Sequence, residues 1–547
     1  MKSLLFSSKI RIGVLVLSLS TFSIHVRAQF TAFDPIVSTF AGTGAKGLVN
    51  GAGNVARFGV VSAIKLDSKG NAYVVDASNN CVRKITPAGV VSTFGNTTTL
   101  KNPFGLAIDK QDNLYVTDLN NRCIRKITPA GVMSLYAGVA GSAAYIDGPK
   151  GTAKFYSPTT IATDLQGNVY VVDNKFTNPT LQNFIRKIAP DGSVSTLVGG
   201  PDGYVDAIGN KARFKDPQGM IADSLGNLYV VDGGNNKIRK IRLSDTLVTT
   251  FAGGSMHGYM DGNLTTARFY APQELTFDKL GNFYLTDYHN QLIRKISDNF
   301  VSTYAGVYDS AGYVNGAGTL AKFDYPIGIV SDSAGNLLVC DVTNNVIRKI
   351  SPQKLAPFTA SVGAASPVQP LYVSGDNLDG SLMTVKAPAG YEVSLDGTSG
   401  FSSEVVLTGI EGSVLTTKVF LRLSANNVQG ARNGEVTLVA SVSLVPTSST
   451  MAIVGTVSGP LGLENSLKNS AHVYPNPAAN ELFIESSSDW QVTDCQVVSM
   501  DGKLHYATQL TISTNTQSID ISSLEQGIYV LRLSNGKQQT YTTFSKR

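Results

Sequence analysis

A phrase that recurs six times between residues 70 and 350 is the strongest constraint on the fold. In its clearest copy, residues 226–241, the sequence GNLYVVD leads through a turn into NNKIRKI. A turn, an alternating apolar run, an acidic stop and a second apolar run predict a β-hairpin. The repeated aspartate–arginine pairs are Asp76 and Arg83, Asp118 and Arg125, Asp173 and Arg186, Asp232 and Arg239, Asp287 and Arg294, and Asp341 and Arg348. Because these aspartates recur every 42 to 59 residues, the chain is predicted to be an array of units that bury their faces only against neighbours.

Each unit reads as four strands, and the last unit lacks its outer strand. In the fourth unit this strand is VTTFAG at residues 248–253, but residues 351–357 after the sixth hairpin read SPQKLAP. The missing copy, VSTFAG, stands at residues 37–42, before the first hairpin. A closed ring explains the displacement, because a strand from the start of the chain then seals the last sheet and removes an exposed edge. Residues 29–355 are therefore predicted to form a six-bladed β-propeller.

The repeated phrase resembles the NHL repeat family. Residues 217–241 follow that family's pattern of a Pro-Xaa-Gly opening, a Gly-Asn-apolar-Tyr-Val-Asp strand and an Asn-Asn-Xaa-Ile-Arg-Lys strand. The third unit departs from it by an insertion at residues 175–183, and the first lacks the Pro-Xaa-Gly opening. The resemblance implies a propeller of the NHL type.

Beyond the propeller the periodic signal stops, and seven or so short alternating strands follow in residues 356–457. This pattern is typical of a β-sandwich. The phrase APAGYEVS at residues 387–394 resembles an Ig-like module of bacterial surface proteins. Residues 458–472 are polar and weakly patterned, so we expect a linker there.

Residues 473–547 closely resemble the C-terminal sorting domain of type IX secretion. The motifs that carry the resemblance are the opening Tyr474, Pro475, Asn476 and Pro477, the strand residues Gly527 and Tyr529, and the basic end Lys546 and Arg547. The resemblance implies a small β-sandwich that the type IX secretion machinery recognises, passage across the outer membrane, and removal of the domain. The whole chain is thus predicted to be all-β.

Residues 1–28 read as a signal peptide, with a basic start, an apolar run and a cleavage site between Ala28 and Gln29. We expect Sec export to the periplasm of a Gram-negative bacterium and a final location in the medium or on the cell surface. The apolar run is too short to span a bilayer, and no later stretch qualifies, so the mature protein is expected to lack a transmembrane segment.

Charge and cysteine content exclude two classes of protein. The signal peptide holds four basic and no acidic residues, so the nominal charge of +5 falls to +1 in the mature chain. A near-neutral chain without a basic block argues against nucleic acid as a partner. Four cysteines in 547 residues make no disulfide framework and are expected to be buried as small hydrophobic residues. No cofactor is expected.

Five long connections between units carry a shared phrase, an aromatic or apolar pair followed by Asp or Asn, and end at a phenylalanine expected to pack between blades. All emerge on one face of a propeller, together with the turns that follow the repeated aspartates. The candidate ligand-binding residues on this face are Tyr145, Asp147, Tyr204, Asp206, His257, Tyr259, Asp261, Tyr313 and Asn315. A ring of tyrosines beside acids and amides suits a glycan or a protein ligand. The alternative, that the tyrosines only cover the bases of their loops, stays open.

The repeated charges are expected to be structural. Each aspartate should close the turn after it by an Asx-type bond, and each arginine should pair with a carboxylate between blades. Only two histidines, His257 and His289, lie in the predicted propeller; His289 sits in a repeat turn and is expected to be ordinary surface. A secreted or surface binding protein is the favoured function. Two alternatives stay open: a secreted lyase or hydrolase, with or without a metal ion, and a structural surface-layer component.

Overall fold

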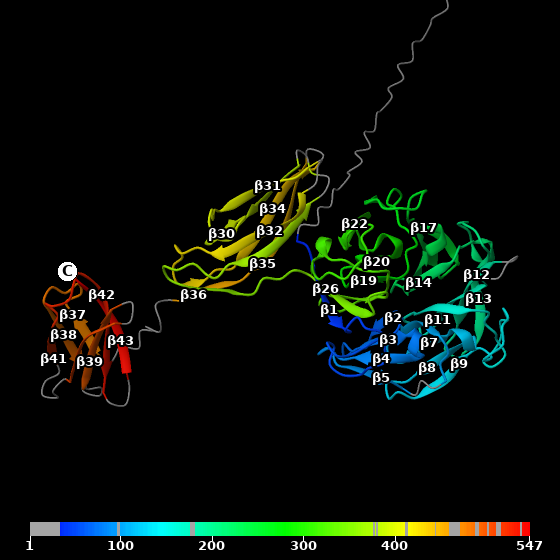
Figure 1. Cartoon of the computed structure of the whole chain (residues 1–547), viewed down its shortest axis with the longest axis horizontal. Helices are drawn as coiled ribbons and strands as arrows, with labels where there is room; N and C mark the ends of the chain where they lie inside the picture. The colour runs from blue at the N-terminus through cyan, green and yellow to red at the C-terminus, as the bar shows by residue number, and fades with distance from the viewer. Residues whose placement is uncertain are drawn as a thin grey trace, which may run out of the picture.

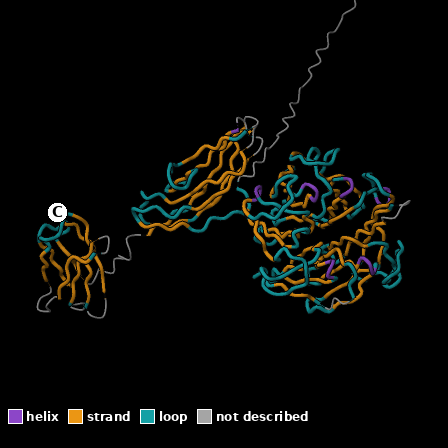
Figure 2. Tube along the Cα trace, in the orientation of Figure 1, coloured by secondary structure: helices purple, strands orange, loops and turns teal. Residues whose placement is uncertain are grey.

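The computed structural model describes residues 33–95, 99–175, 181–375, 378, 381–410, 414–442, 445–458, 471–486, 492–499, 503–509, 516–535 and 539–547. The predicted signal peptide and its cleavage site lie outside these residues. Strands and loops make up nearly all of the described chain (Figure 2). Its 3-10 helices are single turns of three residues: η1 (Ala77–Asn79), η2 (Leu119–Asn121), η3 (Gly209–Lys211), η4 (Gly233–Asn235), η5 (Tyr288–Asn290) and η6 (Gly318–Leu320).

Six antiparallel sheets form the blades of a ring (Figure 1). Blade 1 is β2 (Val61–Leu66), β3 (Ala72–Asp76), β4 (Cys81–Ile85) and β5 (Val91–Phe94); blade 2 is β6 (Pro103–Ile108), β7 (Leu114–Asp118), β8 (Cys123–Ile127) and β9 (Met133–Ala137). Blade 3 is β10 (Pro158–Thr163), β11 (Val169–Lys175), β12 (Gln182–Ile188) and β13 (Val194–Pro201); blade 4 is β14 (Pro217–Ala222), β15 (Asn227–Asp232), β16 (Lys237–Arg242) and β17 (Leu247–Ala252). Blade 5 is β19 (Leu275–Phe277), β20 (Phe283–Asp287), β21 (Leu292–Ser297) and β22 (Phe300–Ala305), with β18 (Gly262–Asn263) at its edge.

Blade 6 is closed by the start of the chain, as the sequence predicts. Its own strands are β24 (Pro326–Ser331), β25 (Leu337–Asp341) and β26 (Val346–Ser351), and β1 (Ile36–Ala41) pairs antiparallel with β26, with the short β23 (Gly316–Ala317) beyond it. Leu338, Cys340 and Ile347 of this blade share a core with Ile64 and Val74 of blade 1. The six-bladed propeller is therefore confirmed, and its last sheet has no open edge at β26.

Fully buried phenylalanines lie between neighbouring blades. Phe214 shares a core with Val172 of blade 3 and Val230 of blade 4, and none of the three is exposed. Burying one such ring stabilises the fold by about 1.5–3 kcal/mol. The equivalent wedges are Phe58, Phe155, Phe214, Phe269 and Phe323. The four cysteines are free and buried.

Strands end at Ser351 and resume at Phe358, on either side of the boundary predicted after residue 355. Three sheets follow and share one core: β28-β32-β30, β31-β29-β34-β35 and β27-β36-β33. Their strands are β27 (Phe358–Ser361), β28 (Gln369–Gly375), β29 (Leu382–Lys386), β30 (Tyr391–Ser394), β31 (Glu404–Thr408), β32 (Val414–Leu423), β33 (Gly430–Ala431), β34 (Gly434–Val442), β35 (Val445–Ile453) and β36 (Gly455–Ser458). This region is the predicted sandwich.

The C-terminal domain is a second, smaller sandwich around its own core. Its sheets are β37-β38-β41 and β40-β39-β42-β43. The strands are β37 (Ala471–Tyr474), β38 (Glu481–Ser486), β39 (Asp494–Ser499), β40 (Leu504–Gln509), β41 (Thr516–Asp520), β42 (Gly527–Ser534) and β43 (Gln539–Lys546).

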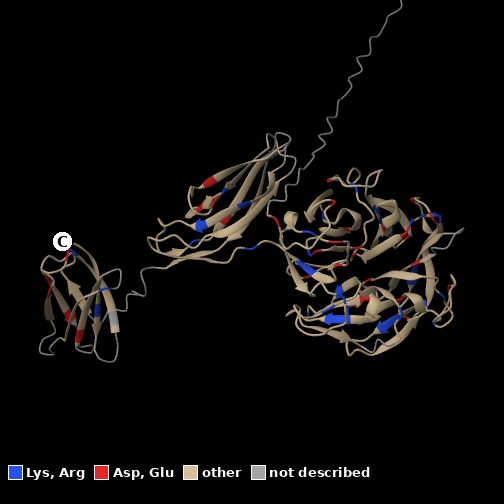
Figure 3. Cartoon of the chain, viewed as in Figure 1, with Lys and Arg blue, Asp and Glu red and all other residues tan. Residues whose placement is uncertain are grey.

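Two surface properties follow from this arrangement. In the described part of the chain, no helix has the length and apolar character needed to cross a membrane. Basic and acidic residues are interspersed around the propeller blades (Figure 3).

A buried carboxylate joins the propeller to the sandwich. Asp34, which is not exposed, accepts the Ser374 hydroxyl at 2.6 Å and the Thr416 hydroxyl at 2.7 Å, both from the sandwich. It also accepts the hydroxyl of Thr319, in η6 of the propeller, at 2.7 Å. Its own N–H donates to the carbonyl of Tyr372 in β28 at 3.2 Å. The residues just before β1 thus hold the closing blade and the sandwich together.

Replacing Asp34 with Ala is expected to lower the free energy of unfolding by about 3 kcal/mol, because one buried hydroxyl and two half-buried hydroxyls lose their acceptor. Thermal and urea melting of the purified protein measures this loss. Asp245→Ala is the matched control, since it removes an aspartate from an exposed Arg242 pair and should cost at most about 0.5 kcal/mol. If the two variants melt alike, Asp34 does not secure the joint.

Candidate functional site

The loop face of the propeller is built on a buried arginine that recurs in five blades. In blade 4, Nη1 of Arg239 donates to Oδ2 of Asp232 at 2.8 Å and to the carbonyl of Arg213 at 3.0 Å. Its Nη2 donates to the carbonyl of Val205 at 3.0 Å and to Asp206. The five arginines, all unexposed, are Arg83, Arg186, Arg239, Arg294 and Arg348. Each therefore ties the long connection that enters its blade to the hairpin of that blade.

The repeated aspartate does not act as the sequence predicts. Oδ1 of Asp232 accepts the N–H of Lys215, in the incoming connection, at 2.8 Å, and Oδ2 accepts the Asn235 amide at 2.9 Å. Its one bond to the turn after it comes from the Asn235 side chain, and it accepts no backbone N–H of that turn. The expected Asx-type closure is wrong, because that turn satisfies itself through Asn236 in the left-handed conformation, whose N–H donates to the Gly233 carbonyl. The expected pairing between blades is also wrong for this ion pair, since Asp232 and Arg239 face each other within one hairpin.

Burial and hydrogen bonding act in opposite directions on these carboxylates. Burial raises the pKa of Asp232 to about 6, while the amide of Asn235, the N–H of Lys215 and Arg239 lower it. In blade 3, burial raises the pKa of Asp173 to about 7 against the lowering effect of Arg186. Because the donors around each carboxylate bond its charged form, we assign Asp232 as ionised at neutral pH.

Three of the predicted tyrosines lie against these arginines. The guanidinium carbon of Arg239 is 4.9 Å from the centre of the Tyr204 ring and 5.0 Å from that of Phe214. Tyr259 lies 5.2 Å from Arg294, and Tyr313 lies 5.0 Å from Arg348. The hydroxyls of these tyrosines contact outer-strand threonines at 2.6 to 3.2 Å. Each ring therefore has a structural partner, although it also keeps an exposed face.

The other predicted residues are likewise distributed blade by blade. Asp147 pairs with Arg186 at 2.6 Å, and Asp206 and Asp261 pair with the arginines of blades 4 and 5. Asn315 accepts from Arg348 at 2.8 Å. The Tyr145 ring stacks on Tyr156 instead of an arginine, with 5.4 Å between ring centres. The predicted set is thus brought together in pairs and not into one site, and its ligand-binding role stays a prediction.

A group of seven rings lies on blades 5 and 6, and five of them have no aromatic counterpart in the other blades; Tyr259 recurs as Tyr145, Tyr204 and Tyr313, and Tyr270 recurs as Tyr156. We call this group the aromatic strip: His257, Tyr259, Tyr270, Tyr288, His289, Tyr308 and Tyr325. Ring centres are 4.9 Å apart for His257 and Tyr270, 4.6 Å for Tyr270 and His289, and 4.7 Å for Tyr288 and Tyr325. The Tyr259 and Tyr308 rings stack at 4.5 Å. The Tyr259–Tyr308 stack adjoins the rings around Tyr270, because His257 and Tyr259 belong to the same loop.

The strip occupies positions where the repeats diverge. Tyr288 and His289 stand in the turn that holds Gly233 and Gly234 in blade 4 and Ala77 and Ser78 in blade 1. In both blade 4 and blade 5 the second residue of this turn donates its N–H to the incoming connection, here from His289 to the Tyr270 carbonyl at 3.1 Å. Large rings therefore replace small side chains on an unchanged backbone frame.

Tyr325 stands in a left-handed backbone conformation with φ of 55°. The same position holds Asn102, Asp216 and Ala271 in other blades, also with positive φ. A bulky residue there costs about 1–2 kcal/mol. The Gln291 side chain of blade 5 accepts the Tyr325 N–H at 2.7 Å and so holds the ring at the blade junction.

Sequence reasoning found His257 and Tyr259 but missed the other five rings, and set His289 aside as ordinary surface. A position-by-position comparison of the six repeats would have singled out Tyr288 and His289. It would not have revealed that Tyr308, from the next connection, stacks on Tyr259.

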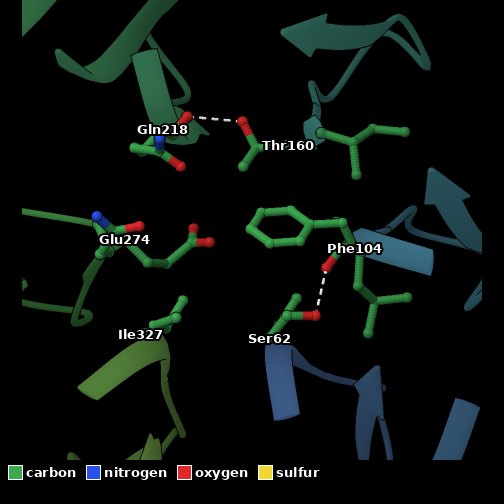
Figure 4. Close-up of a pocket in the computed structure, with 11 residues that line it drawn as sticks. Ser62, Phe104, Thr160, Gln218, Glu274 and Ile327 are labelled. Carbon is green, nitrogen blue, oxygen red and sulfur yellow. Dashed lines mark hydrogen bonds between the residues drawn. The ribbon is translucent and has the colours of Figure 1, made fainter. Parts of the chain in front are cut away.

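The central channel offers a second group of polar residues. One residue from each blade points toward its centre: Ser62, Phe104, Thr160, Gln218, Glu274 and Ile327 (Figure 4). Glu274 stands where blades 2, 4 and 6 have a glycine, and it pairs with Lys65 at 3.2 Å. Burial raises the pKa of Glu274, and Lys65 lowers it. The pocket leaves about 10 Å³ for the centres of water-sized molecules, which is room for about one water.

No metal site accompanies this channel in the parts of the chain that the structure describes. There, no three His, Cys, Asp or Glu side chains gather closely enough to hold a metal ion.

The predicted sorting motifs converge on one edge of the C-terminal domain. Oδ1 of Asn476 accepts the N–H of Ser545 at 3.0 Å, and its Nδ2 donates to the Thr543 carbonyl at 3.1 Å. Gly527 pairs with Lys546 across β42 and β43. The remaining motif residues belong to the same arrangement: Tyr474, Pro475 and Pro477 flank Asn476, Tyr529 pairs with Phe544, and Arg547 follows Lys546.

Residues 472–546 match the family model described as a secretion system C-terminal sorting domain. The chain is 28% identical over 193 residues to NHL repeat-containing protein 2 of Bos taurus, covering 33% of this chain and 26% of that protein. It is also 28% identical over 160 residues to Protein SUPPRESSOR OF QUENCHING 1, chloroplastic, of Arabidopsis thaliana, covering 27% of this chain and 14% of that protein. The chain thus spans about a quarter or less of the length of these relatives.

Solved structures resemble the propeller at low identity. An auxiliary nutrient binding protein from Bacteroides thetaiotaomicron aligns at 20% identity and a TM-score of 0.46, covering 58% of this chain and 76% of that one. A catalytically inactive virginiamycin B lyase from Staphylococcus aureus aligns at 16% identity and a TM-score of 0.35, covering 53% and 80%. Likenesses at these scores say nothing about what this chain binds or catalyses.

The predicted resemblances to NHL repeats and to a C-terminal sorting domain are confirmed. The sorting domain makes this chain a secreted or cell-surface protein.

Replacing Arg294 with Ala is expected to destabilise the protein by about 3–5 kcal/mol, because Asp287 then stays buried without its cation. Arg125→Ala is the matched control. That arginine follows the one compact connection and is partly exposed. Its loss also leaves a buried aspartate, Asp118, without its cation, but it breaks no bonds to the carbonyls of a long connection, so it should cost about 1–2 kcal/mol less than the loss of Arg294. Chemical denaturation of both variants measures the difference. Equal losses would contradict the role given to the long connections.

Deleting residues 473–547 is expected to stop the protein from reaching the medium or the cell surface while leaving the propeller folded. Fractionation of the producing bacterium, with proteolysis of intact cells, shows where the truncated chain accumulates. Substituting the exposed Leu504 with Ala, away from the motif edge, serves as a control that should leave export unchanged. Undiminished surface exposure of the truncated chain would overturn the sorting role.

Proposed function

We propose that the protein is a secreted or cell-surface binding protein, exported by type IX secretion, whose propeller presents its loop face to a glycan or protein ligand. The observation that carries the proposal is the aromatic strip, which departs from the repeat on two adjacent blades only. A scaffold built by repetition has no structural need for rings at Tyr288 and His289, because small residues fill both positions in blades 1 and 4.

The strip has the properties of a binding surface. Tyr270 is 42% exposed and Tyr308 is 50% exposed, so two large rings at different points of the strip face solvent. Exposed aromatic side chains held on a rigid frame lose little conformational freedom on binding, and they provide most of the binding energy at many interfaces. The backbone bond from His289 to Tyr270 supplies that rigidity.

Catalysis in the channel has less support. Glu274 would be the acid or base, but Lys65 already bonds its Oε1 and the pocket has room for about one water. A purely structural surface role would not explain why the strip carries exposed aromatic rings.

The proposal is tested by incubating the purified protein with a printed glycan array and with a peptide display library. Binding to at least one of these probes is expected, and Tyr270→Ala combined with His289→Ala should weaken it at least about tenfold. Leu280→Ala, which removes an exposed side chain from the turn at the other end of β20 from Tyr288, should leave it intact. Absence of binding to both probes, or equal loss in the control, would contradict the proposal.

A further inference from the structure

We infer that the aromatic strip binds an uncharged saccharide chain several sugar units long. This inference rests on the proposed function, since it names the ligand of the face proposed to bind. Three features of the strip carry it: its several adjoining rings, the free polar edges of those rings, and the charge around it.

The strip offers several adjoining rings. Tyr288, His289 and Tyr325 contact one another at 4.7 to 5.9 Å at the junction with blade 6, and His289 also meets Tyr270 at 4.6 Å. From Tyr270 the rings continue through His257 to the loop that carries the Tyr259 stack. A group of adjacent rings provides successive platforms, which suits a ligand that is itself a chain of rings.

The strip also offers unused polar groups. Within the described residues, no side chain or backbone group bonds the hydroxyls of Tyr270, Tyr288, Tyr308 or Tyr325. A sugar ring has an apolar C–H face that packs on an aromatic ring and hydroxyls around its edge that can bond these phenols. An apolar protein anchor would bury the same hydroxyls without partners, which is unfavourable.

The charge around the strip disfavours an anionic ligand. The guanidinium of Arg294, beneath the Tyr259 ring, is buried and already paired with Asp287 and Asp261, and Asp324 lies near Tyr288. The pKa of Tyr288 is raised by burial, and further by Tyr325 and Asp324. Nucleic acids and acidic polysaccharides require basic groups for binding, so neutral sugars fit better.

The experiment measures binding of the purified full chain to soluble neutral polysaccharides (β-glucan, xylan, galactomannan and starch) and to acidic ones (polygalacturonate and chondroitin sulfate). Affinity electrophoresis identifies the ligand, and calorimetry with its oligosaccharides of increasing length gives affinities. We expect binding to a neutral polymer, with an affinity that rises with oligosaccharide length. Tyr270→Ala and Tyr308→Ala should each weaken it at least about fivefold and together more than about tenfold. Leu280→Ala, which removes an exposed side chain at the opposite end of blade 5, should not change it.

Tyr270→Phe keeps the ring and removes the hydroxyl, so it should weaken binding less than Tyr270→Ala. Melting curves establish that each variant is folded. No binding to any neutral polymer, or binding that the strip variants leave unchanged, would overturn the inference. Binding only to acidic polymers or to displayed peptides, lost in the strip variants, would also overturn it while leaving the proposed binding function standing.

Discussion

The architecture of the loop face depends on the burial of five guanidinium groups. An arginine removed from water is stable only where carboxylates and carbonyls surround it. Here the hairpin supplies one carboxylate, and the incoming connection supplies two carbonyls and a further acid or amide, as around Arg239. The long connections are therefore part of the electrostatic core of their blades. Blade 2, which has a compact connection, shows the converse: Arg125 is partly exposed and keeps only its aspartate from this network.

The burial of these arginines also distinguishes the aromatic residues that maintain the fold from those available to bind a ligand. The rings of Tyr204 and Tyr313 pack on the buried arginines of their blades. A tyrosine therefore recurs at this position because the fold requires it. The rings of Tyr288 and His289 satisfy no such requirement and occur once. In a repeat protein, what every unit shares maintains the fold, and what one or two units add is available for recognition.

Much of the fold could be predicted from the sequence, because a propeller repeats its pattern and each blade reads in local terms. The displaced strand at residues 37–42 even revealed the closure. The candidate site was harder to predict, because the strip is assembled from two connections and one turn that are separate in the sequence. The contact between Tyr204 and Arg239 could not be predicted for a related reason, because the arginine lies 35 residues further along the chain. The role of Asp34 depends on hydroxyls from three distant segments, and no local pattern marks it.

Closure by β1 has a kinetic consequence. Ser38 and Lys349, which meet across β1 and β26, are separated by 311 residues, whereas the strands within a blade meet across short turns. Bringing such distant ends together costs about 3 kcal/mol more loop-closure entropy than forming a hairpin of a dozen residues. The first strand to leave the ribosome must therefore wait, unpaired, for the last blade. An exported chain enters the periplasm in the same order, so the ring stays open until about residue 351 has crossed the inner membrane. The ring can therefore close only after the whole propeller has entered the periplasm.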